Sequence, residues 1–348
     1  MAEWVKREHG KGAINRAGKV LLEWWVSPDD MDLEPWAAVY RLVKNWRLCH
    51  ALPLNVIQAG LRGRIRRMGL SSRDVIVAQR LKRFPSIMRK LEREPHMELT
   101  QMQDLGGCRA ILPDIASVRT LYGMYYGHEP LLLEENSSIK PYDYIAHPKP
   151  DGYRGIHVVA RYHPRKDERL PWDGQRIEIQ LRTKLQHAFA TAVETVTTFT
   201  REPLKFGAGS VEWRRFFSLM GSALALREGT PLVENTPHVE QELIRELRAA
   251  ATELRVTQRL HGWADMLRTL PRQHIKNFKY LLLVLNTTEN TIAVKGFQNR
   301  REAGDAIAEI EQSKRTDLDA VLVWVNSIKN LRAAYPNYYA DTTAFLEA

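Results

Sequence analysis

The stretch RIEIQLRT, residues 176–183, alternates between apolar and polar side chains. Because successive side chains of a β-strand point to opposite faces, this alternation predicts a strand with one apolar and one polar face. The apolar face would consist of Ile177, Ile179 and Leu181. The other face would present Glu178, Gln180 and Arg182, and so would place a carboxylate, an amide and a guanidinium on one sheet surface.

Two further segments predict strands. GIHVVARYH at 155–163 alternates in the same way, and GCRAILP at 107–113 is a short apolar run that ends in a proline. Helices are predicted between them, at 114–127 and 184–199. Strands and helices mixed at this spacing indicate an α/β or α+β domain, which we place at residues 71–202.

The regions on either side have different patterns. Residues 1–70 predict a helical N-terminal region, with one helix at 14–28 and one or two more at 35–68, broken near Pro53. Residues 203–275 predict a Gly- and Pro-rich linker that contains an aromatic helix, followed by a long helix at 238–269. Residues 276–348 predict a small C-terminal α/β module with the order strand, turn, strand, helix, strand, helix.

Composition restricts the class of protein. The 348 residues carry a net charge of +10, which favours polyanionic partners such as nucleotides, RNA or acidic proteins. The sequence contains no run of about 20 apolar residues, so we expect no membrane-spanning helix. The first residues lack the apolar segment of a secretory signal, and Cys49 and Cys108 match no zinc motif. We therefore expect a cytoplasmic protein with no membrane association.

Basic residues gather in RLKRFPSIMRKLER, residues 80–93. Pro85 suits the start of a helix in which Lys90 and Arg93, three residues apart, share a face. Arg80 and Lys82 come just before this helix. Cations that converge in this way can hold a triphosphate, because guanidinium and ammonium groups pair with phosphate oxygens. A solvated basic helix face is the alternative.

The segment DLGGCR, residues 104–109, places Asp104 and Arg109 near the start of a predicted strand. A carboxylate suits a hard cation such as Mg²⁺, and the two glycines permit close approach of a ligand. Beside Asp104, Glu178 could complete a metal site and accept a proton from a hydroxyl. Taken alone, the segment also fits an ordinary helix-to-strand turn.

The loop KPYDYIAHPKPDGYRGIH, residues 140–157, combines cations with aromatic rings. An aromatic ring beside cations can stack on a base while the cations hold its phosphates. A polar hairpin loop is the alternative. The candidate binding residues in this loop are Lys140, Lys149, Tyr153, Arg154 and His157.

Taken in order, the four motifs resemble the synthetase domain of the RelA/SpoT family, over roughly residues 75–200. The resemblance implies an α+β, nucleotidyltransferase-like fold, in which a mixed sheet is flanked by helices. It also implies an enzyme, a pyrophosphokinase that uses Mg²⁺. Such an enzyme transfers pyrophosphate from ATP to the 3′-hydroxyl of GDP or GTP, which makes (p)ppGpp and AMP.

The resemblance assigns roles to single residues. Asp104 and Glu178 match the metal ligands, and Glu178 also matches the group that activates the acceptor hydroxyl. The residues that would hold ATP are Arg80, Lys82, Lys90, Arg93 and Arg109. Those that would contact the acceptor are Lys140, Lys149, Tyr153, His157 and Gln180, with Tyr153 stacked on its base. Further candidates are Arg154, Arg182, His187 and Glu194.

The sequence departs from the family pattern at two points. Gly155 stands where the family motif usually has Ser, which predicts a looser acceptor loop. No His-Asp pair with the flanking pattern of the family's hydrolase domain is present, so we expect synthesis without hydrolysis.

Two other functions remain as alternatives. Toxin-type members of the family pyrophosphorylate tRNA 3′ ends or make adenosine alarmones. The net charge, the Arg62–Arg67 cluster and the C-terminal module are features that fit such a member. A catalytically silent nucleotide-sensing module is the second alternative, and the presence of both Asp104 and Glu178 argues against it. Residues 276–348 could also bind a regulatory protein or support a homo-oligomer.

Overall fold

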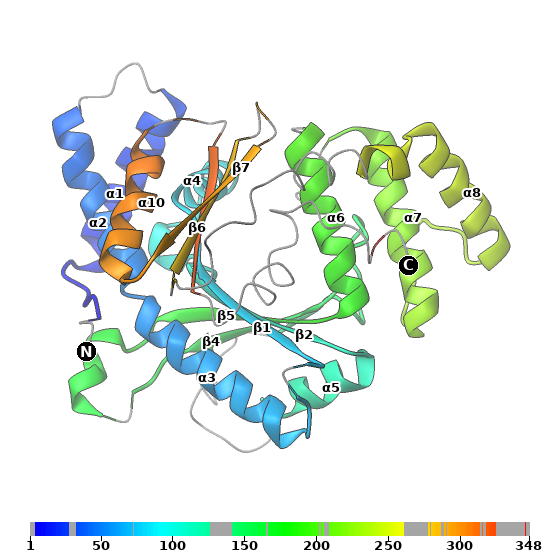
Figure 1. The fold of residues 1–348 in the computed structure, drawn as a ribbon, viewed down its shortest axis with the longest axis horizontal. Helices are drawn as coiled ribbons and strands as arrows, with labels where there is room; N and C mark the ends of the chain where they lie inside the picture. The colour runs from blue at the N-terminus through cyan, green and yellow to red at the C-terminus, as the bar shows by residue number, and fades with distance from the viewer. Residues whose placement is uncertain are drawn as a thin grey trace.

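A computed structural model gives the arrangement of the chain in space (Figure 1). It describes residues 4–27, 33–71, 73–125, 141–164, 166–200, 202, 204, 209–260, 278, 280–286, 289, 291–313, 315, 318–324 and 345. These residues form a five-stranded sheet flanked by helices and a separate three-stranded sheet. The predicted fold class, a mixed sheet flanked by helices, is confirmed.

The larger sheet has the strand order β1-β2-β5-β4-β3. Its members in that order are β1 (Ile76–Leu81), β2 (Gly106–Leu112), β5 (Arg176–Thr183), β4 (Ile156–Arg161) and β3 (Tyr142–Asp143). β2 and β5 pair in parallel, and the other neighbours pair antiparallel. The sequence patterns predict β2, β4 and β5 but miss the two edge strands, because β1 lacks a clear alternation and β3 has only two residues.

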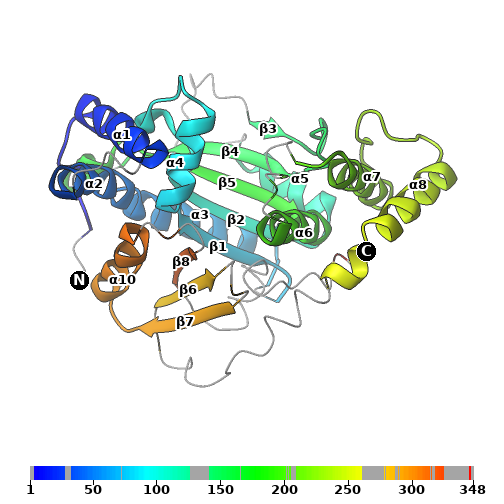
Figure 2. The same ribbon diagram turned by 90° about the horizontal axis from the view of Figure 1, so that it is seen from above.

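One face of this sheet packs against α3 (Ala51–Arg67) and α5 (Ile115–Gly123), which lie below it in Figure 1. The apolar residues predicted for β4 and β5 point into this core, and Ile156, Ile177, Ile179 and Leu181 are fully buried. Burial of such a side chain stabilises the fold by roughly 1.5–3 kcal/mol. The polar faces of β4 and β5 are therefore turned to the opposite side, over which α4 (Phe84–Arg93) and α6 (Lys184–Thr200) lie (Figure 2).

The N-terminal helices support α4. α1 (Lys11–Val26) and α2 (Leu33–Leu48) share a core with the apolar side of α4, which contributes Phe84, Ile87, Met88 and Leu91. This packing fixes the basic helix at one end of the sheet surface. The chain breaks between α2 and α3 at residues 49–50 rather than near Pro53. Pro53 is the third residue of α3, in the first turn, where its missing N–H costs no intrahelical hydrogen bond.

The aromatic helix predicted within the linker region is α7 (Val211–Glu228), and it is packed against the domain. Trp213, Phe216 and Phe217 are buried in one cluster with residues of α6. Gly221 lies so close to Gly152 that a Cβ built on Gly221 would be 2.6 Å from the Cα of Gly152. α7 therefore supports the loop that precedes β4.

The helix predicted at 238–269 is interrupted. α8 (Glu240–Glu253) ends in a turn at Leu254 and Arg255, where Arg255 has a φ of 49°, and helix resumes at 256–260. Residues 261–269 lie outside the described residues. Two parallel contacts join α8 to α7, from Arg215 Nε and Nη2 to the carboxylate of Glu246 at 2.6 and 2.8 Å.

The C-terminal module consists of β6 (Tyr280–Asn286), β7 (Thr291–Phe297), α10 (Arg300–Gln312) and β8 (Leu318–Trp324). β6 and β7 form the predicted hairpin, and the sheet order is β7-β6-β8. The module has a core of its own, and β8 contacts the edge strand β1. The helix predicted after β8 lies outside the described residues.

Two further features of the chain concern membrane spans and the cysteines. Within the described part of the chain, no helix is both long enough and apolar enough to span a membrane. Cys49 and Cys108 are free thiols, and burial raises the pKa of each to about 12.

The buried imidazole of His50 makes stability depend on pH. Burial lowers its pKa to about 4, although Nδ1 lies 2.8 Å from the carbonyl oxygen of Trp46. The unfolded chain therefore binds this proton more readily than the folded chain, and stability is lost as the pH falls from about 6.5 towards 4. We expect a loss of up to about 3 kcal/mol from this group.

Urea unfolding at pH 4.5 and 7.5 measures that loss. His50→Asn keeps a donor for the Trp46 carbonyl but cannot titrate, so its unfolding midpoint should change less between the two pH values than that of the wild type. An equal change in both proteins would contradict the assignment.

Candidate active site

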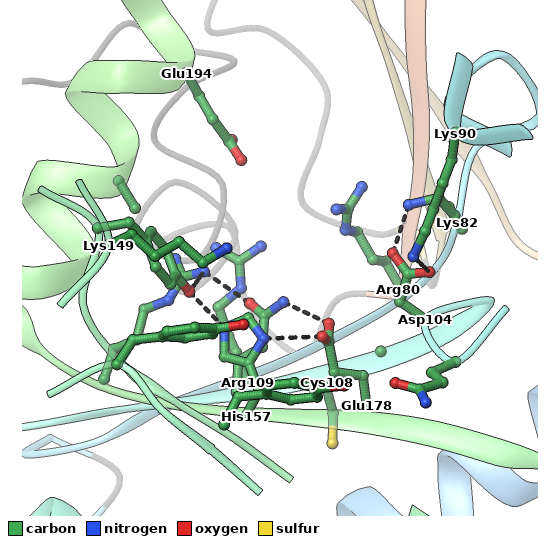
Figure 3. A pocket seen from close by; sticks show the side chains of 18 of the residues that line it. Arg80, Lys82, Lys90, Asp104, Cys108, Arg109, Lys149, His157, Glu178 and Glu194 are labelled. Carbon is green, nitrogen blue, oxygen red and sulfur yellow. Dashed lines mark hydrogen bonds and ion pairs between the residues drawn. The ribbon is translucent and has the colours of Figure 1, made fainter. Parts of the chain in front are cut away.

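A cavity of about 540 Å³ lies on the polar side of the larger sheet, between α4 and α6 (Figure 3). Most of the residues singled out from the sequence line it together. They are Arg80, Lys82, Lys90, Arg93, Asp104, Arg109, Lys149, Tyr153, His157, Glu178, Gln180, Arg182 and Glu194. Segments up to about a hundred residues apart in the chain thus meet in one place.

Strand register brings the central residues together. In one row across the sheet, Arg109 of β2 pairs with Gln180 of β5, which pairs with His157 of β4. Two residues earlier in β2, in the next row on the same face, Arg80 of β1 pairs with Gly107, which pairs with Glu178. Gly107 has no side chain, so the surface between Arg80 and Glu178 stays open.

One end of the cavity is strongly cationic. Asp104 accepts hydrogen bonds from Lys82 Nζ at 2.5 Å and from Lys90 Nζ at 3.2 Å, and Arg80 lies beside them (Figure 3). Burial alone would raise the pKa of Asp104, but the two ammonium groups outweigh it and hold that pKa well below its usual range. A single carboxylate thus orders the lysines before any ligand arrives.

The same crowding acts on Lys82. Burial lowers its pKa to about 8, and Asp104 opposes this shift while Arg80 and Lys90 add to it. An anion bound near these groups would relieve the repulsion among the cations. This end of the cavity is therefore suited to a polyphosphate.

The other end holds a closed ring of hydrogen bonds. Glu178 Oε1 lies 2.9 Å from His157 Nδ1, and His157 Nε2 lies 2.6 Å from the hydroxyl of Tyr153. Arg182 Nη2 donates to that hydroxyl at 2.7 Å and to Gln180 Oε1 at 2.9 Å, and Gln180 Nε2 donates to Glu178 Oε2 at 2.7 Å. Every contact is satisfied when His157 carries its proton on Nδ1. The ring fixes the orientation of all five side chains.

This ring keeps Glu178 ionised. Burial alone would raise the pKa of Glu178, but the attraction and hydrogen bond of His157 outweigh burial, and Gln180 adds a further hydrogen bond. The pKa of Glu178 therefore lies well below its usual range. A partly buried carboxylate held in its charged form can bind a cation or accept a proton.

Aromatic rings beside this network were missed in the sequence analysis. Tyr142 and Tyr144 line the cavity, with their rings stacked at 5.9 Å, and Lys149 Nζ lies 4.4 Å from the centre of the Tyr144 ring. Tyr144 also meets Tyr153 edge to face at 5.8 Å. The clustering of three tyrosines in residues 142–153 is a sequence signal that could have indicated them.

Three of the predicted residues are not in this group. Arg154 is buried outside the cavity lining, where it donates to the carbonyl oxygens of Gly221 and Pro231 and so ties the loop to α7. His187 is buried within α6 and does not line the cavity. Lys140 lies outside the described residues. Glu194, by contrast, points from α6 towards the cavity (Figure 3).

The Arg62–Arg67 cluster lies away from the cavity. Its residues belong to α3, which covers the opposite face of the sheet. Arg64 is buried, with its guanidinium 4.6 Å from the centre of the Tyr125 ring. These arginines are therefore not part of the cationic end of the site.

The segment that carries most of the cavity lining is similar to known proteins. Residues 79–201 match the family model described as "Region found in RelA / SpoT proteins". This part of the chain is therefore similar to RelA/SpoT proteins. The chain is 29% identical over 154 residues to a GTP pyrophosphokinase of Haemophilus influenzae and 32% identical over 110 residues to one of Bacillus subtilis. Those alignments cover 44% and 30% of this chain, but only 18% and 49% of the two relatives.

A similarity to solved structures covers a larger part of the chain. The small alarmone synthetase 2 of Bacillus subtilis superposes with a TM-score of 0.43 and 21% identity, over 53% of this chain and 92% of that one. In this chain α7, α8 and the C-terminal module follow residues 79–201, the segment that the family model matches.

Gly155 has a conformation that explains its identity. Its φ is 144°, and a Cβ would lie 3.2 Å from Arg182 Cγ, 3.3 Å from the Leu181 carbonyl oxygen and 3.5 Å from the Tyr153 hydroxyl. The glycine thus lets Arg182 and Tyr153 approach the backbone closely. The predicted loosening of the loop does not describe this packing, in which Gly155 also accepts a hydrogen bond from the Tyr144 N–H at 2.9 Å.

Gly155→Ser should lower the free energy of unfolding by about 1–3 kcal/mol, because the side chain would strain the backbone and press on Arg182. Urea unfolding measures the change. Gly123→Ser is the matched control, since a Cβ at Gly123 meets nothing within 4 Å. Equal stability of the two variants would show that Gly155 is not strained by a side chain.

Proposed function

We propose that the RelA/SpoT domain transfers pyrophosphate from ATP to the 3′-hydroxyl of GDP or GTP, which yields (p)ppGpp and AMP. The observation that carries the proposal is the meeting, in one cavity, of a cationic end around Asp104 and a carboxylate network around Glu178. The names of the curated relatives, GTP pyrophosphokinases, support this activity. As synthesis without hydrolysis is expected from the motifs, we propose a synthetase.

The donor would lie at the cationic end. Lys82, Lys90 and Arg80 converge there, with Arg93 and Arg109 also in the cavity wall. The phosphates of ATP would replace or join Asp104 as the partner of the lysines. Their negative charge would oppose the effects of burial, and of the neighbouring Arg80 and Lys90, which lower the pKa of Lys82. Positioning and charge neutralisation account for most of the catalysis in such transfers.

The family implies Mg²⁺, and the donor set fits it. Mg²⁺ usually takes one or two carboxylates together with substrate phosphates, and the cavity offers Asp104 and Glu178. Both are held in the charged form. Among the described residues no cluster of three or more metal-binding side chains occurs, so phosphate oxygens and water would complete the shell. A bound Mg²⁺ would supply charge stabilisation for the transferred phosphates.

The acceptor would lie at the ring of hydrogen bonds. Its 3′-oxygen forms a bond to the β-phosphorus of ATP, the bond between the β-phosphorus and the α,β-bridging oxygen breaks, and AMP leaves. Glu178 takes the proton of the hydroxyl. His157 and Gln180 each occupy one oxygen of Glu178, and the hydroxyl would donate to a remaining lone pair of this carboxylate. Tyr153, Tyr144 and Lys149 would hold the base.

An RNA 3′ end or an adenosine nucleotide remains as an alternative acceptor in the same site. The position of the Arg62–Arg67 cluster on the opposite sheet face removes one feature that favoured RNA. The C-terminal module would have a separate role, in regulation, in oligomer formation or in binding a partner protein.

The direct test is transfer of label. The protein is incubated with γ-labelled ATP and Mg²⁺, separately with GDP, GTP, ATP alone and deacylated tRNA. Label in a guanosine product supports the proposal. Label only in tRNA or in an adenosine product overturns the choice of acceptor, and no label in any product favours a silent binding module.

Glu178→Gln in the same assay tests the assignment of the base. The variant keeps the shape of the side chain but cannot accept the proton, so the rate should fall roughly 10²- to 10⁴-fold. Asp173→Asn is the matched control, because it changes a carboxylate paired with a histidine, His163 at 2.8 Å, outside the cavity. A Glu178→Gln enzyme as active as the control would refute the proposed role of Glu178.

A further inference from the structure

A phenylalanine near the end of the sequence is packed behind the acceptor end of the cavity. Phe345 is 4% exposed and belongs to the buried aromatic cluster between α6 and α7. Its ring centre lies 6.5 Å from that of Phe189 and 6.4 Å from those of Phe216 and Phe217. Such contacts between aromatic rings stabilise a cluster beyond the area they bury.

The cluster touches the acceptor loop directly. A Cβ on Gly152 would lie 2.8 Å from Phe189 Cζ and 2.4 Å from the carbonyl oxygen of Phe217. Gly152 has a φ of 84°, and it also lies against Gly221, one turn beyond Phe217 in α7. The loop thus rests on the two phenylalanines that Phe345 supports from behind.

The next residue along the loop is Tyr153, which also packs against the cluster. Its hydroxyl joins the ring of hydrogen bonds that ends on Glu178. Phe189 is itself part of the cavity wall. One layer of side chains therefore separates Phe345 from the space where the acceptor would bind.

We propose that Phe345 is a positioning residue for the acceptor: by supporting Phe189 and Phe217 it fixes the height of Gly152 and Tyr153 over the sheet. The cationic end is built on α4 and the N-terminal core, which do not share this cluster. Loss of Phe345 should therefore affect acceptor binding and spare donor binding. The measurement of KM in the test below rests on the proposed transfer reaction, whereas the measurement of hydrogen exchange does not.

The test uses full-length Phe345→Ala, Phe345→Leu and Phe297→Ala. Phe297 is a buried phenylalanine in the separate core of the C-terminal module, so it controls for the loss of a ring elsewhere. Phe345→Ala should raise the acceptor KM roughly 5- to 20-fold and leave the ATP KM within about 2-fold, as for a lost positioning contact. Phe345→Leu, which refills much of the space, should recover most of the acceptor affinity.

Hydrogen exchange supplies a readout that needs no activity. In Phe345→Ala the amides of residues 149–157 should exchange faster, whereas those of residues 80–93 should be unchanged and Phe297→Ala should leave both segments as in the wild type. Unchanged exchange at 149–157, or equal changes at 80–93, would overturn the proposal. If the wild type transferred no label, only the proposed function would fail, because the exchange result would still decide the role of Phe345.

Discussion

The parallel pairing of β2 with β5 is the constraint on which the site depends. It sets Gly107 beside Glu178 and Arg109 beside Gln180, so residues some seventy positions apart share one surface. β1 adds Arg80 on one side and β4 adds His157 on the other. A shift of one residue in either pairing would turn the polar face of β5 into the core and bury Glu178 without partners. The buried Ile177, Ile179 and Leu181 therefore hold the register that the chemistry requires.

The two ends of the cavity hold charges of opposite sign, cations at one end and the carboxylate of Glu178 at the other. Neighbouring side chains stabilise the charges at each end. At the cationic end, Asp104 offsets the repulsion among the lysines. At the other end, a ring of five side chains offsets the cost of burying Glu178 as an anion. Each arrangement is complete without ligand, and in the proposed reaction each would also take up a substrate group. Preorganised charge of this kind is the main source of rate in transfers of phosphoryl groups.

The sequence patterns predicted those features that depend on short stretches of the chain. The alternation in β4 and β5 gave the correct faces, and the basic, acidic and aromatic motifs predicted thirteen residues that now line one cavity. What the patterns missed depends on contacts between distant segments. Arg154 looks like a ligand in its motif, but it donates to the carbonyl oxygens of Gly221 in α7 and of Pro231 just after it. Gly155 resembles a point of looseness, yet its φ of 144° serves close packing. The support that α7 and Phe345 give the loop has no signature in either segment alone.

In the proposed reaction, one surface joins a triphosphate donor to a hydroxyl acceptor and moves two phosphates at once. The most direct measurement is the nucleotide balance of the reaction with ATP, GDP and Mg²⁺, followed by chromatography and mass spectrometry. We expect one AMP for each guanosine product, with that product heavier by two phosphates at the 3′ position. Formation of ADP with a product heavier by one phosphate, or of AMP without any phosphorylated acceptor, would contradict it.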